Sequence, residues 1–154
     1  MVLHIKIEAY MFKNIVVPID LLDNCSRSQS VMSSALKMVS DFHSKIHIIN
    51  VIPNFGIQML EDYLPRNWIR EQKNVSLKKL KNIVNNSIYD NSVEVEYYVS
   101  RGVIYDEVIR YSEQVNADLI MVLAIRPQLG NYMLGSNASK IVRHSSISVL
   151  VIRE

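Results

Sequence analysis

The stretch NIVVPI at residues 14–19 decides the class of fold. It is apolar at nearly every position and does not alternate between apolar and polar residues. Strands that helices cover on both faces of a parallel sheet have this pattern. We therefore expect the folded domain to begin with an inner strand of a parallel sheet.

Similar runs recur along the chain, and helical patterns separate them. The run at 93–99 alternates more cleanly, as a strand nearer an edge of the sheet would. Five strands alternating with four helices predict an α/β fold, namely a five-stranded, open, doubly wound parallel sheet of the Rossmann type. The expected strands are residues 14–19, 45–52, 93–99, 118–124 and 146–152, and the expected helices lie near 31–39, near 69–87, after Gly102 and after Gly135.

The composition is that of one globular domain. Hydrophobic residues make up 49% of 154 residues, and the net charge of +2 comes without a basic block, so the sequence does not favour a nucleic-acid partner. No apolar run approaches the ~20 residues that span a bilayer, so we expect no membrane partner. A single cysteine, Cys25, excludes an internal disulfide and favours a cytoplasmic location. We interpret residues 1–10 as an N-terminal extension, or alternatively as an extra edge strand, and residues 11–154 as the domain.

Ligands of such sheets bind beyond the carboxyl ends of the strands. Gly135, Ser136 and Asn137 stand there, directly before a helical stripe that contains Ala138, Ile141 and Val142. Glycine permits close backbone approach, serine can cap the helix, and free N–H groups at a helix start favour an anion. The same residues are also typical of plain helix capping, so a phosphate site and a simple cap both remain open.

The C-terminal third of the chain contains RP at 126–127, YMLGSNA at 132–138, VRH at 142–144 and SVLVIR at 148–153. These motifs resemble those of the universal stress protein superfamily. More narrowly, they are similar to a small bacterial subgroup with an RP…YxLGSNA signature. NIVVPID at 14–20 and Gly102 with Asp106 also match, so the resemblance covers residues 12–153.

This resemblance implies a Rossmann-like fold of the adenine nucleotide α-hydrolase type and a site for ATP or a related adenine nucleotide, with Mg²⁺ as an associated ion. The family's phosphate loop keeps Gly135 and Ser136 here, whereas Leu123 and Arg126 replace two glycines. Arg126 is either a cationic substitute that binds phosphate or a solvated loop arginine. The implied binding residues are Pro18, Ile19, Asp20 near adenine and ribose, Val51 at the adenine, Leu123, Ala124, Arg126, Gly135, Ser136 and Asn137.

The sequence shows no catalytic triad, no nucleophile elbow and no Gly-x-x-x-x-Gly-Lys-Ser/Thr loop. His47 lies within an apolar strand and is expected to be packed or surface-facing. His144 ends a helix, where its charge suits the dipole, or else lies near the phosphates. We therefore expect no catalytic residue, no metal site and at most slow, incidental ATP hydrolysis. A small enzyme of the α-hydrolase type is a further alternative, which the lack of a Ser-Gly-Gly loop after the first strand disfavours.

The last strand predicts a partner, because Ser148 to Ile152 is strongly apolar at what we expect to be a sheet edge. Members of the resembled family commonly form dimers through this strand, so the expectation is a homodimer. The alternative is an edge covered by the N-terminal extension. Two functions follow: a nucleotide-binding stress-response regulator that contacts unknown protein partners, or a nucleotide-free homodimeric interaction protein of the same fold.

Overall fold

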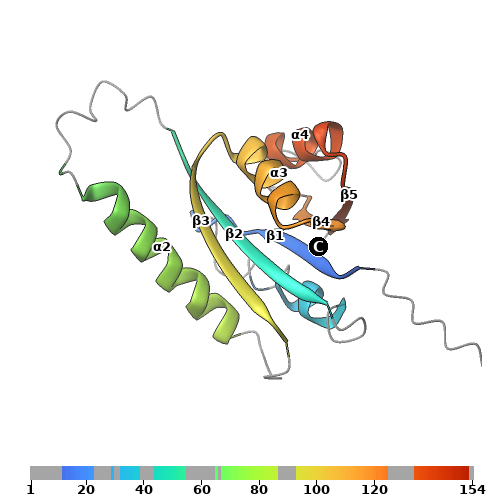
Figure 1. The fold of residues 1–154 in the computed structure, drawn as a ribbon, viewed down its shortest axis with the longest axis horizontal. Coiled ribbons are helices and arrows are strands. Elements are labelled where there is room, and N and C mark those ends of the chain that lie inside the picture. The colour runs from blue at the N-terminus through green and yellow to red at the C-terminus, as the bar shows by residue number, and fades with distance from the viewer. Residues whose placement is uncertain are drawn as a thin grey trace, which may run out of the picture.

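The structure, a computed structural model, describes residues 12–22, 29, 32–38, 44–54, 65, 67–86, 93–124 and 134–152. Five parallel strands form one sheet in the order β3-β2-β1-β4-β5, as Figure 1 shows. The strands are β1 (Asn14–Pro18), β2 (Lys45–Pro53), β3 (Val95–Gly102), β4 (Leu119–Leu123) and β5 (Ser148–Ile152). The labelled helices are α2 (Trp68–Asn85), α3 (Ile104–Gln114) and α4 (Ser136–His144), and residues 32–38 are also helical.

The predicted fold class is confirmed. Successive strands extend from β1 through β2 to β3 on one side, and the chain then crosses to β4 and β5 on the other side. The strand order therefore reverses between β1 and β4, which is the place where doubly wound sheets bind ligands. The runs predicted at 14–19, 45–52 and 118–124 form the three inner strands, and the run with the cleaner alternation lies in edge strand β3.

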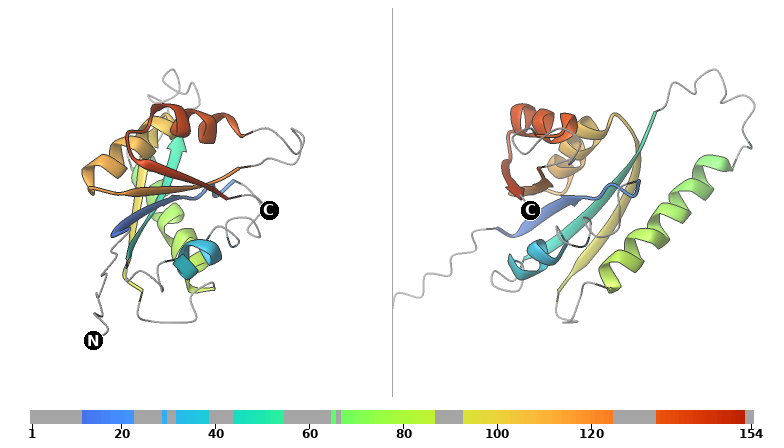
Figure 2. Two further views of the ribbon diagram at one scale, coloured as in Figure 1. Left: turned by 90° about the vertical axis from the view of Figure 1, so that its right-hand side faces the viewer. Right: turned by 180° about the vertical axis from the view of Figure 1, so that it is seen from behind.

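Helices cover both faces of the sheet (Figure 2). On one face, Ile15, Val17, Ile46 and Ile48 pack against residues 32–38 and against α2. On the other face, α3 and α4 cover a second apolar cluster. That second cluster contains Val16, Ile49, Val51, Ile120 and Val122 from the strands, and Val108, Tyr111, Ala138 and Ile141 from the helices.

The sequence prediction fails at a few positions of the core. Val142, expected in the buried stripe of the last helix, is 44% exposed, whereas Ala138 and Ile141 are buried. The buried positions of α4 are thus three residues apart, and Val142 follows on the outer side of the helix. Met32, which the sequence analysis did not include, is fully buried.

Several predictions concern residues outside the described parts of the chain. These are the extension or extra strand at residues 1–10, the thiol of Cys25 and the loop arginine Arg126. Within the described residues, no helix combines the length and the apolar character that a membrane crossing requires.

Candidate functional site

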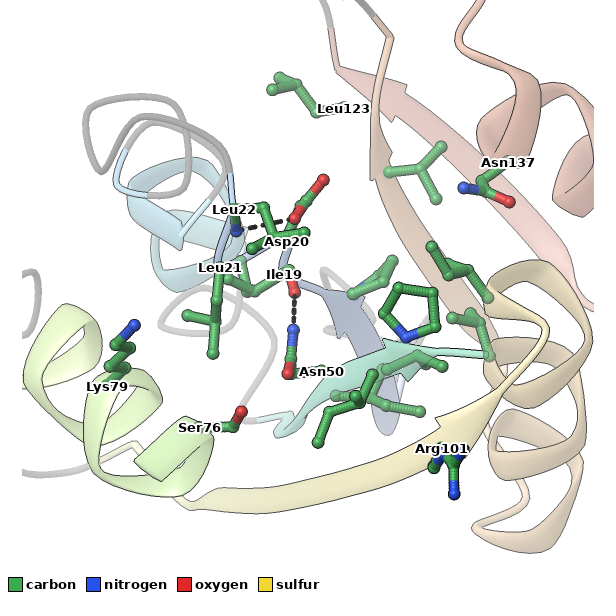
Figure 3. A pocket seen from close by; sticks show the side chains of 18 of the residues that line it. Ile19, Asp20, Leu21, Leu22, Asn50, Ser76, Lys79, Arg101, Leu123 and Asn137 are labelled. Carbon is green, nitrogen blue, oxygen red and sulfur yellow. Dashed lines mark hydrogen bonds between the residues drawn. The ribbon is translucent and has the colours of Figure 1, made fainter. Parts of the chain in front are cut away.

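A cavity of about 610 Å³ opens at the carboxyl edge of the sheet, where the strand order reverses. Strand ends of β1, β2 and β4 form its floor, α4 lies at one side and α2 at the other, as Figure 3 shows. Its volume lies within the range of small-molecule binding sites, about 300–1,000 Å³. The described lining is mostly apolar and includes three charged side chains, Asp20, Lys79 and Arg101.

The turn after β1 is held by backbone and amide hydrogen bonds. The Ile19 N–H donates to the carbonyl of Ile49 (2.8 Å), and the buried Asn50 Nδ2 donates to the carbonyl of Ile19 (2.9 Å). The next residue, Asp20, accepts a hydrogen bond at Oδ1 from the N–H of Leu22 (2.9 Å). These contacts hold the Asp20 carboxylate at the cavity, where it is exposed.

The opposite side is built from the end of β4 and the start of α4. The Gly135 N–H donates to the carbonyl of Ala124 (3.2 Å), and the Ser139 N–H donates to the carbonyl of Gly135 (2.9 Å). The latter is the first bond of the helix, so the N–H groups of residues 136–138 have no partner within α4. Such groups, together with the helix dipole, attract an anion.

Gly135 leaves room for a ligand at this helix start. A Cβ atom built on it would have no heavy atom within 4 Å, and its φ of −56° is one that any residue adopts. The predicted capping role of Ser136 is wrong. Gly135 itself is the N-cap, Ser136 is the first helical residue, and no cap hydrogen bond from a side chain is present among the described residues. Within the described residues, therefore, this helix start is not the serine-capped end that was one of the two predicted alternatives, and a phosphate site stays a prediction.

The α2 side of the cavity was missed by the sequence analysis. Trp68, Gln72, Val75, Ser76 and Lys79 all line it. Their spacing of four, three, one and three residues places them on one face of α2. These five residues form a second stripe along α2, beside the face that carries the buried residues Leu80, Ile83 and Val84. This second stripe is the signal from which the wall could have been predicted.

Most of the predicted binding residues surround this one cavity. Ala124 does not line it but is buried beside it and accepts the hydrogen bond from Gly135, and Arg126 lies outside the described residues. The lining also contains Ile104 and Arg101 from the β3–α3 corner, which the sequence did not indicate. The predicted residues that line the cavity are Pro18, Ile19, Asp20, Val51, Leu123, Gly135, Ser136 and Asn137.

The histidines of the described residues lie away from this cavity. His47 is buried at the other end of β2, 3% exposed, and its ring contacts Glu96 and Tyr111. Burial lowers the pKa of His47, and the nearby carboxylate of Glu96 opposes that shift. His144 is exposed in the last turn of α4 and lies 5.9 Å from the Tyr105 ring, centroid to centroid. Among the described residues, no three His, Cys, Asp or Glu side chains cluster closely enough to hold a metal ion.

Comparison with known proteins identifies the class to which the fold and cavity belong. Residues 11–153 match the model of the Universal stress protein family, so this chain belongs to that family. Universal stress protein G of Escherichia coli O157:H7 is 26% identical over 145 residues, which cover 93% of this chain and 100% of that protein. Universal stress protein MJ0531 of Methanocaldococcus jannaschii is 24% identical over 149 residues, with 94% and 84% covered.

Solved structures share the fold. The hypothetical protein MJ0577 has a TM-score of 0.70 at 19% identity and covers 94% of this chain and 97% of its own. A universal stress protein in complex with cAMP has a TM-score of 0.64 at 16% identity, with 92% and 97% covered. The universal stress protein from Archaeoglobus fulgidus in complex with dAMP has a TM-score of 0.63 at 19% identity, with 91% and 97% covered.

Proposed function

We propose that this protein binds an adenine nucleotide in the cavity at the carboxyl edge and acts in a stress response by binding rather than by catalysis. The observation that carries the proposal is the open start of α4. Gly135 leaves space there, and the N–H groups of residues 136–138 have no intrahelical partner. An anionic phosphate is the group that such a helix start accommodates best.

The rest of the cavity suits a nucleoside. Asp20 presents an exposed carboxylate that can accept hydrogen bonds from ribose hydroxyls, and Val51 belongs to an apolar wall that can contact a base. Two structural relatives were solved with cAMP and with dAMP, which supports the adenine nucleotides as the class of ligand. Within that class the motif resemblance favours ATP, with Mg²⁺ as a companion of its phosphates.

Calorimetric titration of the purified chain with AMP, with ATP and with ATP plus Mg²⁺ tests this proposal. We expect saturable binding that Gly135→Val abolishes, because its side chain would fill the open space at the start of α4. We also expect Asp20→Asn to weaken binding about tenfold, as the loss of charge-assisted hydrogen bonds does. Asp106→Asn is the matched control, since Asp106 is an exposed acid of α3 that does not line the cavity. Absence of binding to all three nucleotides would refute the proposal.

The edge strand β5 supports a second proposal, a homodimer through Ser148–Ile152. In the described sheet β5 pairs with β4 on one side only, and Leu150 on it is 36% exposed. An apolar strand with an unpaired edge is a surface on which a second copy can extend the sheet. A homodimer without nucleotide would be an interaction protein, which is the alternative function, and a cytoplasmic location stays a prediction from the sequence.

Light scattering during size-exclusion chromatography tests the dimer. We expect twice the monomer mass at micromolar concentration, and a shift toward monomer in Leu150→Lys. Ile69→Lys is the matched control, because Ile69 is 39% exposed on α2, far from β5. A monomeric parent chain, or equal shifts in the two variants, would contradict the proposal.

A further inference from the structure

The side of the cavity next to α2 has its own chemistry. We define the α2 arm as the part lined by Leu22, Trp68, Gln72, Val75, Ser76 and Lys79. Only the C-terminal half of α2 has residues in the core, namely Leu80, Ile83 and Val84. The N-terminal half instead faces the cavity, and it diverges from β3 in Figure 1.

Apolar side chains remain exposed in this arm. Leu22 is 80% exposed on the turn after β1, and Val75 is 46% exposed on α2. Trp68, the single tryptophan of the chain, lies at the first helical position and lines the same arm. Apolar groups that converge on a cavity favour a ligand with an apolar body, because its burial removes their surface from water.

The face of α2 that lines the cavity ends at a cation, Lys79. Lys79 lines the cavity, is exposed and has no hydrogen bond or ion pair to a carboxylate within the described part of the chain. Figure 3 shows Lys79 and Ser76 projecting from α2 on the side of the cavity away from Asn137. Ser76 is three residues before Lys79, so both side chains can reach one acceptor.

The other end of the stripe disfavours an anion. The first turn of α2 carries Glu71, whose carboxylate accepts a hydrogen bond from Asn67 Nδ2 (2.6 Å). A second negative charge there would be repelled. An anionic head group is therefore expected at Lys79 and an apolar body toward Trp68, which is about 16 Å away along the helix axis.

We infer that the α2 arm binds a small amphipathic carboxylate of the medium-chain fatty acid type. Its head group lies on the Lys79 ammonium and the Ser76 hydroxyl, and its chain lies against Val75, Leu22 and Trp68. A single ammonium and hydroxyl suit a singly charged carboxylate, whereas the three N–H groups at the start of α4 suit a phosphate. The arm is thus a second ligand site beside the proposed nucleotide site.

Trp68 provides a local signal, since no other tryptophan contributes to the emission. Titration of the full chain with decanoate below its micellar concentration is expected to change Trp68 emission in a saturable way. Decanol, which lacks the charge, should bind at least about tenfold more weakly.

A pair of adjacent lysines sharpens the test. Lys79→Glu should weaken decanoate binding by about tenfold or more, because the variant places a like charge at the head group. Lys78→Glu is the matched control, since Lys78 is exposed on the same helix but does not line the cavity. It should leave the affinity within about twofold, because exposed charges at a distance are screened.

The inference is overturned if decanoate gives no saturable signal, if the two lysine variants weaken it equally, or if decanol binds as well. It is also overturned if AMP occupies the arm, which would appear as loss of AMP affinity in Lys79→Glu. The nucleotide proposal is judged separately, by calorimetry with AMP and ATP and by Gly135→Val. Either proposal can therefore fail while the other stands.

Discussion

The two ends of the same sheet differ in how their polar groups are satisfied. At the amino end, Lys45 Nζ contacts Glu94 Oε1 (2.8 Å) and Glu96 Oε1 (2.6 Å), and Glu96 Oε2 contacts His47 Nδ1 (3.2 Å). These contacts raise the pKa of Lys45 to about 12, through hydrogen bonds to Glu94 first and Glu96 second, and Lys45 in turn lowers the pKa of Glu96. At the carboxyl end, the N–H groups at the start of α4 and the Lys79 ammonium meet a cavity instead.

The two ends of the sheet therefore contribute differently to stability and to binding. The amino end joins β1, β2, β3 and α3 through side chains that satisfy one another. Within the described residues, the first N–H groups of α4 and the Lys79 ammonium have no such side-chain partner at the carboxyl end, and the proposed ligands would contact them there. Substitutions at the amino end should therefore cost stability, and substitutions of residues that line the cavity should mainly affect binding.

The largest expected effect compares two aromatic residues. Tyr111→Ala removes a ring that is 5% exposed, stacks on Tyr98 at 4.2 Å between centroids and contacts His47. It should lower the free energy of unfolding by about 3–5 kcal/mol. Trp68→Ala at the cavity should lower it by less than about 2 kcal/mol, because the ring is only half-buried. Urea denaturation followed by circular dichroism measures both losses, and equal losses would contradict the difference in stability between the two ends of the sheet.

Two glycines of the carboxyl edge provide the next test. Gly102 has φ +157°, and a Cβ on it would lie 2.8 Å from Glu107 Cγ, in a side chain that Arg110 Nη2 holds at 2.7 Å. Gly102→Ala should therefore cost about 1–3 kcal/mol. Gly135→Ala should stay within about 0.5 kcal/mol, since its Cβ would meet open space. If urea midpoints shift alike for the two variants, the carboxyl edge is less open at Gly135 than we describe.

The pH dependence of stability tests whether His47 is buried at the amino end of the sheet as described. Burial depresses the pKa of His47 in the folded state, below its usual value of about 6.5 in the unfolded chain. The unfolded state thus binds more protons at His47. The contribution of the neutral, buried His47 to stability is therefore fully present above about pH 6.5 and is lost as the pH falls through the folded-state pKa. The slope from this group is at most about 1.4 kcal/mol per pH unit.

His47→Gln should flatten that slope below about pH 6.5. Thermal unfolding at a series of pH values measures this slope in the variant and in the parent chain. An unaltered slope in His47→Gln would show that another group carries the pH dependence.

The smallest expected effect on stability is that of Ser136→Ala. The Ser136 side chain makes no cap hydrogen bond, so the free energy of unfolding should change by less than about 0.5 kcal/mol. Any loss of AMP affinity in the same variant would then reflect a contact with ligand rather than a weaker helix. A cost near 1 kcal/mol in chemical denaturation would instead restore Ser136 as a capping residue.

Much of the site could be predicted because its motif is local in sequence. Gly135, Ser136 and Asn137 are contiguous and precede a helical stripe, and Asp20 directly follows an apolar strand. The α2 wall could not be predicted, since an amphipathic helix reveals its apolar positions but not how far it diverges from the sheet. The partners of His47 could not be predicted from local sequence patterns either, because Asn14 is 33 residues away along the chain and Tyr111 is 64 residues away.

Local sequence patterns specify the five strands, the helices between them, the parallel α/β class and the edge of the sheet at which the candidate site lies. Each of these depends on periodicity within a few residues, which local side-chain geometry imposes on any strand or helix. Three features depend on the tertiary structure: β1 lies between β2 and β4, His47 is buried against Tyr111, and α2 lines one side of the cavity. These features arise from contacts between segments far apart in the chain, where packing rather than local preference selects the arrangement.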